Sequence, residues 1–239
     1  MPKTAKPRQV LTRDRVLAAA LALVDQHGLE ALTMRSLGES LSVEAMSLYR
    51  YCPSKADLHA GIADRVLGEI VFTPANRGWR PDLGNAMRAF WRVLVQHPNA
   101  VPLMLTTPLD TPRGRAAGEG MVRLVTRAGF APPDAHRIFR MLQAFALGTA
   151  LMLRANRPDS RMPPQNADDE PSERRAPSAE RRAPSAERRV PRTAYPLLRA
   201  ALADARSIDL EADFEVGLEL QLDGIEAART QLTTKRKRR

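Results

Sequence analysis

The chain has 239 residues, of which 44% are hydrophobic and 27% charged, with a net charge of +10; this composition is typical of a globular protein. The positive charge is concentrated near the N-terminus, in residues 171–192 and in the C-terminal KRKRR, so it does not by itself indicate a nucleic-acid groove. A single cysteine, no secretory-signal pattern and no run of roughly 18 apolar residues exclude a disulfide framework and a membrane partner, and predict a cytoplasmic protein.

Apolar residues recur at helical spacing and strand patterns are scarce, which predicts an all-α fold. Residues 12–27 form the first expected helix, capped by Thr12 and ended by Gly28. Thr33 caps a second over residues 34–41, and a third extends from about 43 to 51. Pro53 and Ser54 separate it from a fourth over 55–70.

Four longer helices are expected in the second half of the chain, over residues 83–96, 113–128, 133–154 and 210–229, with a shorter one around 195–205. The break near residues 72–81 is rich in Pro, Gly and Asn and separates a small N-terminal unit from a larger helical one. The expected organisation is a basic N-terminus (1–11), an N-terminal domain (12–72), a C-terminal domain (82–230) and a basic tail (231–239).

Residues 156–192 are expected to form a disordered insertion, because they join an acidic stretch to a seven-residue repeat, PSERRA PSAERRA PSAERRV. Each repeat begins with proline and offers only alanine or valine as apolar residues, which excludes a coiled coil. A role for the basic repeat at 171–190 as a DNA-binding arm is the alternative.

The two short helices of residues 34–51 are joined by LSVE in the layout of a helix-turn-helix, whose second helix enters the major groove of DNA. Leu48 is expected to anchor that helix inward. The outward positions are then Ala45, Met46, Ser47, Tyr49 and Arg50. Lys55 begins the next helix, where an ammonium and backbone N–H groups together suit a phosphate.

The string LTMRSLGESLSVEAMSLYRYCPSKADL (32–58) resembles the tetracycline-repressor-type (TetR) family of transcriptional regulators. The preceding RVLAAALALVDQHGLEAL is similar to the first helix of that family, and DFEVGLELQLDGIEA (213–227) to the last helix of its tetracycline-repressor branch. The resemblance covers most of the chain outside 156–192. It implies a three-helix DNA-binding domain followed by a helical domain for ligand binding and dimerisation.

The resemblance also implies roles for single residues. Arg35 matches a position that reaches a base, commonly guanine. The base-facing tip of the recognition helix is matched by Ala45, Met46 and Ser47, the first two suited to thymine methyl groups. Phosphate-holding positions are matched by Tyr49, Arg50, Tyr51 and Lys55. Ser42 stands where the family often has glycine, so the turn is expected to be slightly adjusted.

The C-terminal helices of such regulators dimerise and enclose a small-molecule pocket. Apolar faces here nominate as dimer contacts Leu147, Leu151, Phe214, Leu218, Leu222 and Ile225, although each could equally belong to the core. The magnesium-ligating positions of tetracycline repressors fall near Val71, Met104 and Met152, which cannot bind Mg²⁺, so no metal and no cofactor are expected.

Soft apolar side chains suggest a hydrophobic effector, with ordinary core packing as the alternative. The nominated pocket residues are Trp91, Met104, Met121, Met141, Phe145 and Met152. The four histidines show no metal-ligand spacing and no catalytic motif is present, so an enzyme is not expected; His97 should end a helix. We expect a repressor that binds a palindromic operator as a homodimer and is released by an effector. The alternative is an effector-independent architectural DNA-binding protein.

Overall fold

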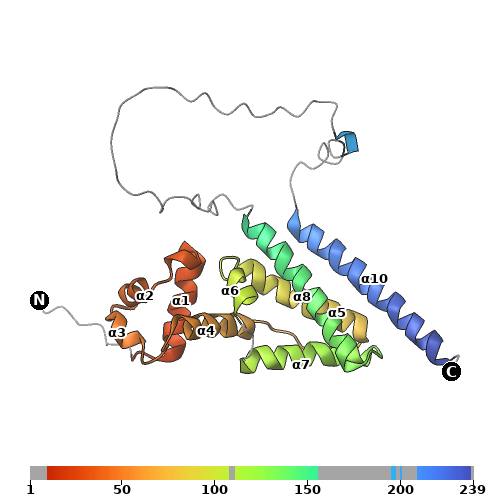
Figure 1. Cartoon of the computed structure of the whole chain (residues 1–239), viewed down its shortest axis with the longest axis horizontal. Helices are drawn as coiled ribbons and strands as arrows, with labels where there is room; N and C mark the ends of the chain where they lie inside the picture. The colour runs from red at the N-terminus through yellow and green to blue at the C-terminus, as the bar shows by residue number, and fades with distance from the viewer. Residues whose placement is uncertain (1–9, 108–110, 156–194, 198–199, 201–208, 238–239) are drawn as a thin grey trace, which may run out of the picture. The chain divides into compact units, whose positions relative to one another are not determined.

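The structure is a computed structural model that describes residues 10–107, 111–155, 195–197, 200 and 209–237 (Figure 1). Within these ranges every regular element is a helix, which confirms the expected all-α class. The helices named below all belong to one compact unit made of residues 1–158 and 210–239. The insertion expected at 156–192 lies outside the described residues, as does most of the short helix expected around 195–205.

The N-terminal elements follow the expected order. They are α1 (Arg13–His27), the 3-10 turn η1 (Leu29–Ala31), α2 (Met34–Leu41), α3 (Ala45–Leu48) and α4 (Lys55–Gly68). The two expected caps, Thr12 and Thr33, are confirmed, and Ser54 caps α4 in the same way: each side chain accepts a hydrogen bond from the backbone N–H of the third residue of its helix. Thr33 and Ser36 also form a reciprocal capping box.

Helix α3 is shorter than the expected 43–51. Its first turn cannot begin before Ala45, because the N–H of Val43 bonds to the carbonyl of Gly38, 2.9 Å away, and Glu44 is extended. After Leu48 the backbone closes with a turn in which the N–H of Tyr51 reaches the Leu48 carbonyl at 2.8 Å. The helix expected to read DNA is therefore a single helical turn, α3, held between two backbone turns.

The core of the N-terminal helices forms where α1 packs against α2 and α4. Fully or almost fully buried side chains meet there: Val16, Ala20, Val24, Leu37, Leu48, Leu58 and Ile62. Cys52 is also fully buried, as expected for a small packed apolar group, and burial raises the pKa of its thiol. The buried Leu48 thus anchors α3 to this core, while the opposite side of the helical turn is exposed to solvent.

The second half of the described chain contains α5 (Trp79–Gln96), α6 (Val101–Thr106), α7 (Pro112–Arg127), α8 (Pro132–Ala155) and α10 (Leu210–Lys237). Helix α5 begins at Trp79 rather than at 83. Pro81 lies in its first turn, where a backbone N–H has no acceptor within the helix, so the missing N–H of proline does not prevent the helix from starting there. Helix α6 was not predicted, since its six residues are too few to show a period. Helix α10 continues past the expected end at 229.

Helix α8 is the centre of this half and packs against α5, α6, α7 and α10. Helices α8 and α10 run side by side in Figure 1. The ring of Phe214 stacks on Trp91, with centroids 4.3 Å apart, and on Phe145 at 5.7 Å. Gly217 makes room for this arrangement, because a Cβ there would overlap the Phe145 ring. These contacts fix α10 against both α5 and α8.

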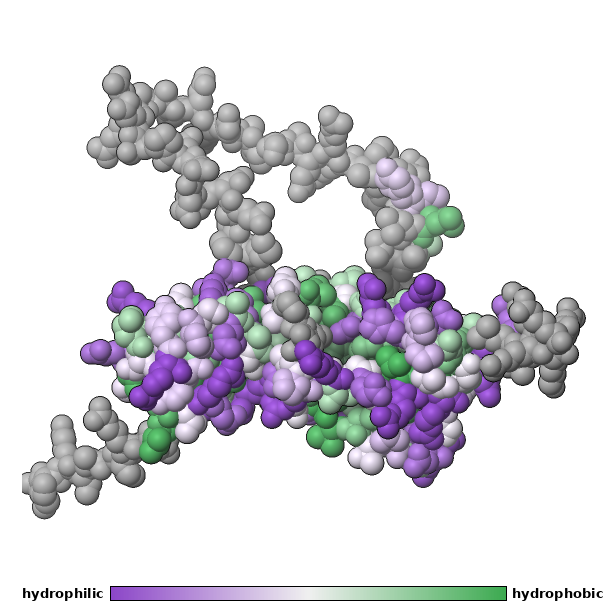
Figure 2. All heavy atoms as spheres, turned by 60° about the horizontal axis from the view of Figure 1, so that its bottom comes forward, coloured by the Kyte–Doolittle hydropathy of each residue, from purple (hydrophilic) through white to green (hydrophobic). Residues whose placement is uncertain are grey.

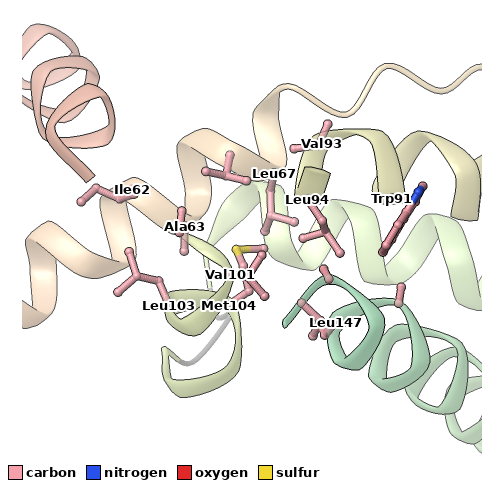
Figure 3. Close-up of a cluster of buried hydrophobic side chains, with 14 of the residues drawn as sticks. Ile62, Ala63, Leu67, Trp91, Val93, Leu94, Val101, Leu103, Met104 and Leu147 are labelled. Carbon is pink, nitrogen blue, oxygen red and sulfur yellow. The ribbon is translucent and has the colours of Figure 1, made fainter. Parts of the chain in front are cut away.

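Helix α4 also enters the core of the second half. Figure 3 shows Ile62, Ala63 and Leu67 of α4 beside Leu94 of α5 and Leu103 of α6, all of them buried. Among the described helices, α8 alone is long and apolar enough to cross a membrane, which is weak evidence by itself because a core helix passes the same test. It packs against four other helices of the same unit.

Candidate DNA-binding and ligand-binding sites

The turn between α2 and α3 depends on two backbone features. A Cβ on Gly38 would lie 2.8 Å from the Val43 carbonyl oxygen and 3.2 Å from the Ala45 nitrogen, so only glycine allows this approach. Ser42 adopts the left-handed conformation, with φ 56° and ψ 42°, that glycine adopts without strain. Sequence reasoning anticipated the strain at Ser42 and missed Gly38, whose signal is a glycine inside a short amphipathic helix.

The outer side of α3 presents the residues expected at its base-facing tip. The Met46 side chain is 76% exposed, which is unusual for a methionine, and Ser47 is also exposed, while Ala45 is half-buried. The structure therefore brings these three side chains to one turn above the buried Leu48.

The expected phosphate-binding side chains flank this turn. Tyr49 and Lys55 are exposed, and Lys55 is the first residue of α4. The guanidinium of Arg50 donates to the hydroxyl oxygen of Tyr51 at 2.7 Å and lies 5.0 Å from the centre of its ring. This contact orders two long side chains beside α3.

Arg35 lies on the exposed side of α2, where Nε donates to Oε1 of Glu39 one turn later, at 3.1 Å. Both side chains are mostly exposed, at 88% and 67%, so the ion pair contributes little free energy and breaks readily. Sequence reasoning missed Glu39. Its position four residues after Arg35 on an expected helix is the signal that the two side chains meet.

The C-terminal end of α4 borders a cavity of about 740 Å³ between α4, α5, α7 and α8. Its apolar lining includes Leu67, Ile70, Phe90, Met121, Leu124 and Phe139. Its polar lining consists of Arg113, Glu119, Arg123, Arg127 and Gln143. Volumes of about 300–1,000 Å³ with few polar groups are usual for small-molecule sites. One helix therefore carries Lys55 at its first residue and reaches this cavity with its last turn.

Of the six side chains nominated for the pocket, the structure brings only Met121 to this cavity. Trp91 and Met104 are buried in the core, and Phe145 packs on Phe214. The nominated residues on α8 that face outward are Met141, 68% exposed, and Met152, 57% exposed. Residue type identifies soft apolar side chains but not the side of the helix on which they lie.

Metal ligands were not expected near Val71, Met104 and Met152. The Val71 side chain is 84% exposed. Within the part of the chain that the structure describes, no three His, Cys, Asp or Glu side chains are grouped closely enough to hold a metal ion.

The side chains nominated for a dimer interface lie mainly inside their own subunit: Leu147, Phe214, Leu218, Leu222 and Ile225 are buried, and Leu151 is half-buried. Exposed apolar or small residues follow the opposite sides of the same helices. On α8 this stripe consists of Met141, Ala144, Gly148 and Met152, and on α10 of Val216, Leu220, Gly224 and Ala227. Apolar groups also gather in patches between charged residues on the face shown in Figure 2.

Two family models match the chain. One, described as bacterial regulatory proteins of the tetR family, matches residues 16–62, and the other, described as the tetracyclin repressor-like C-terminal domain, matches residues 73–229. The chain belongs to the TetR family. In this TetR-family chain, the first match contains the helix-turn-helix. The second match contains the cavity-lining residues from position 74 onward.

Relatives of this TetR-family chain include an HTH-type transcriptional regulator of Saccharopolyspora erythraea, 35% identical over 134 residues, which are 55% of this chain and 56% of the relative. The HTH-type transcriptional repressor DrrR1 of Streptomyces coeruleorubidus is 31% identical over 60% of this chain and 54% of its own length. The chain therefore spans little more than half the length of these two relatives.

A solved structure of a possible TetR family transcriptional regulator from Streptomyces coelicolor is 28% identical to the chain. Its TM-score is 0.72, with 90% of this chain and 99% of the other covered. Similarity at this level over nearly the whole length confirms the TetR fold, with an N-terminal helix-turn-helix domain and a larger helical domain.

Proposed function

We propose that the chain is a transcriptional repressor that binds a palindromic DNA operator as a homodimer and releases it when a small effector occupies the cavity. The observation that carries this proposal is α4, which begins with Lys55 beside the recognition turn and ends with Leu67 and Gly68 at the cavity wall. A helix of this length spans about 20 Å. Movement at its cavity end therefore reaches the DNA-facing surface without an intermediary.

DNA recognition is assigned to the surface around α3. The recognition turn offers the apolar Met46 and the hydroxyl of Ser47 to base edges, and Arg35 lies within reach on α2. The phosphate contacts are assigned to Tyr49, Arg50, Tyr51 and Lys55, which fix register and orientation without reading sequence. The repressor name of one relative, DrrR1, supports repression as the direction of control.

The homodimer is assigned to the exposed stripes of α8 and α10. Glycines at 148 and 224 have open space where a Cβ would stand, so a partner helix can approach their backbones closely. Two such helices from each subunit would form a four-helix contact related by a two-fold axis. A two-fold dimer places its recognition elements on half-sites about 34–36 Å apart, which predicts a palindromic operator.

The effector is assigned to the cavity, and the family relatives, which are transcriptional regulators, support a role without catalysis. Selection of binding sequences from a random DNA pool, followed by fluorescence anisotropy of the selected duplex, tests the first half of the proposal. Enrichment of a palindrome that binds one dimer is the expected result; recovery of no common sequence would overturn it.

The second half is tested with a compound library, read by thermal stabilisation of the protein and by release of the selected operator. Compounds that stabilise the fold and release DNA support a ligand-responsive repressor. An architectural protein would bind DNA with equal affinity in the presence of every compound that stabilises it.

A further inference from the structure

Resting on the proposed function, we propose that the effector is an amphipathic anion, and that Arg113 in the cavity wall binds its negative group in exchange for Asp64 of α4. The inference narrows the ligand to an apolar, ring-sized body that carries a carboxylate, sulfonate or ionised phenol. It also names the contact through which occupancy reaches the DNA-binding helices.

The charges on the cavity wall favour an anion. Three arginines line the cavity, Arg113, Arg123 and Arg127, against one carboxylate, Glu119. The remaining lining is mainly aliphatic and aromatic. A cation beside apolar surface attracts an anionic group more strongly than it would in water, because the local dielectric constant is lower.

The three arginines differ in how easily they can leave their present partners. Arg127 is the counter-ion of Asp82, whose side chain is 0% exposed and whose Oδ2 lies 3.8 Å from Nη1. Removing Arg127 would leave that buried carboxylate uncompensated, which is costly. Arg123 is held by Glu119 on the same wall at 3.0 Å, so its charge is already balanced within the cavity lining.

Arg113 contacts its partner Asp64 only at long hydrogen-bond distances. Its Nη1 lies 3.3 Å from Oδ2 of Asp64, and its backbone N–H donates to Oδ1 at 3.3 Å. Charge-assisted hydrogen bonds of full strength measure about 2.7–2.9 Å. The Asp64 side chain is 24% exposed, so water can solvate it once the guanidinium leaves. A ligand anion that binds Arg113 at a shorter distance therefore competes favourably with Asp64.

Gly68 provides the room for this exchange. A Cβ on Gly68 would lie 3.0 Å from three atoms of the Arg113 guanidinium, so the guanidinium rests across the last turn of α4. Leu67 and Gly68 line the cavity together with Arg113. Turning the guanidinium toward a ligand thus removes a contact from the end of α4, the helix that begins with Lys55.

The test compares two dyes that share a naphthyl-phenylamine skeleton. 8-Anilinonaphthalene-1-sulfonate is anionic, and N-phenyl-1-naphthylamine lacks the sulfonate; both brighten in apolar sites. Wild-type protein should bind the anionic dye more tightly. Arg113→Gln should lower the affinity for the anionic dye by about 10- to 100-fold, which is the effect of losing one charge-assisted hydrogen bond. The same variant should change the affinity for the neutral dye less than about twofold.

Three further variants complete the design. Asp64→Asn should raise the affinity for the anionic dye by up to about fivefold, because the carboxylate that competes for Arg113 is removed. Arg92→Gln, at an exposed α5 position outside the cavity lining, removes one positive charge as Arg113→Gln does, and it should leave the affinity for both dyes unchanged. Ala117→Trp fills the cavity and should weaken both dyes; unchanged affinities there would show that the dyes bind elsewhere and would overturn the assignment.

Equal weakening of both dyes by Arg113→Gln, or failure of wild-type protein to bind either dye, overturns the anion site. Because the titrations contain no DNA, failure of operator binding leaves their result intact and counts against the proposed function alone. An anion that binds through Arg113 yet leaves operator affinity unchanged in both wild-type protein and Asp64→Asn overturns the exchange step.

Discussion

Nδ1 of His97 lies 2.8 Å from Oδ2 of Asp25, which joins the end of α5 to the last turns of α1. The other ring nitrogen, Nε2, lies 2.8 Å from Oε2 of Glu69, the residue after α4. The hydrogen bond to Asp25, more than the one to Glu69, raises the pKa of His97 to about 9 against the opposing effect of burial. A protonated imidazole thus links three helix ends.

This link predicts a pH-dependent stability. The folded-state pKa of about 9 exceeds the ordinary value of 6.5, so the stabilisation is fully present below pH 6.5 and is lost as the pH rises toward 9. The full shift corresponds to about 3 kcal/mol, and the partial solvation of Glu69, whose side chain is 39% exposed, reduces the contribution to the order of 2 kcal/mol. Urea unfolding at pH 6 to 9 should show the free energy of unfolding of wild-type protein converging on that of His97→Gln. A parallel pair of curves would contradict the link, and His136→Gln, on the exposed surface of α8, is the control.

Gly38→Ala tests the backbone approach in the helix-turn-helix. The added methyl group would meet the carbonyl oxygen of Val43 at 2.8 Å, and backbone cannot move aside as a flexible side chain can. We expect operator affinity to fall at least about tenfold and the free energy of unfolding to fall by about 1–3 kcal/mol. The control is Gly120→Ala on α7, where a Cβ meets nothing within 4 Å and alanine should stabilise the helix. Anisotropy and urea unfolding give the two readouts; wild-type values for Gly38→Ala would disprove the tight turn.

Ser42→Gly should act in the opposite direction. Serine in the left-handed region costs about 1–2 kcal/mol, of which glycine recovers part after its larger loss of chain entropy. A gain of up to about 1 kcal/mol in the free energy of unfolding is expected, with operator specificity unchanged. A loss of stability would mean that the Ser42 side chain makes a contact worth more than the backbone strain.

The sequence predicted the beginnings of α1, α2 and α4 well, because Thr12, Thr33 and Ser54 are local capping signals. The length of α3 and the partners of His97 were not predicted. Asp25 and Glu69 lie 72 and 28 residues from His97, and nothing in the local pattern reports such pairs. The same limit applies to the cavity, since a methionine on α8 faces the core or the solvent according to packing that periodicity alone does not specify.

The dimer assignment predicts that a charge on the exposed stripe of α10 separates the subunits. Val216→Glu places a carboxylate where the valine side chain is 62% exposed in the single chain, so folding should survive while association is lost. Val71→Glu, at a valine 84% exposed outside the stripe, should remain dimeric. Sedimentation velocity distinguishes the two outcomes. If Val216→Glu remains dimeric, the interface lies outside this stripe.

The last prediction concerns the exposed pair of Arg35 and Glu39. Because such a pair contributes only about 0.3–0.5 kcal/mol on a helix, Arg35 can leave Glu39 for a guanine, where a bidentate contact discriminates by about 1–3 kcal/mol. Glu39→Gln should therefore raise affinity several-fold on every operator, since it also removes a negative charge near the phosphates.

Arg35→Ala should weaken binding by about 1–3 kcal/mol on the preferred operator and hardly at all on one whose contacted guanine is replaced. Lys55→Ala provides the contrast: loss of a phosphate contact should weaken both operators equally and flatten the salt dependence by about one unit of slope. Anisotropy titrations of each variant on both operators at several salt concentrations measure all of these effects. If Arg35→Ala weakens both operators equally, Arg35 holds a phosphate, and base reading is left to Ala45, Met46 and Ser47.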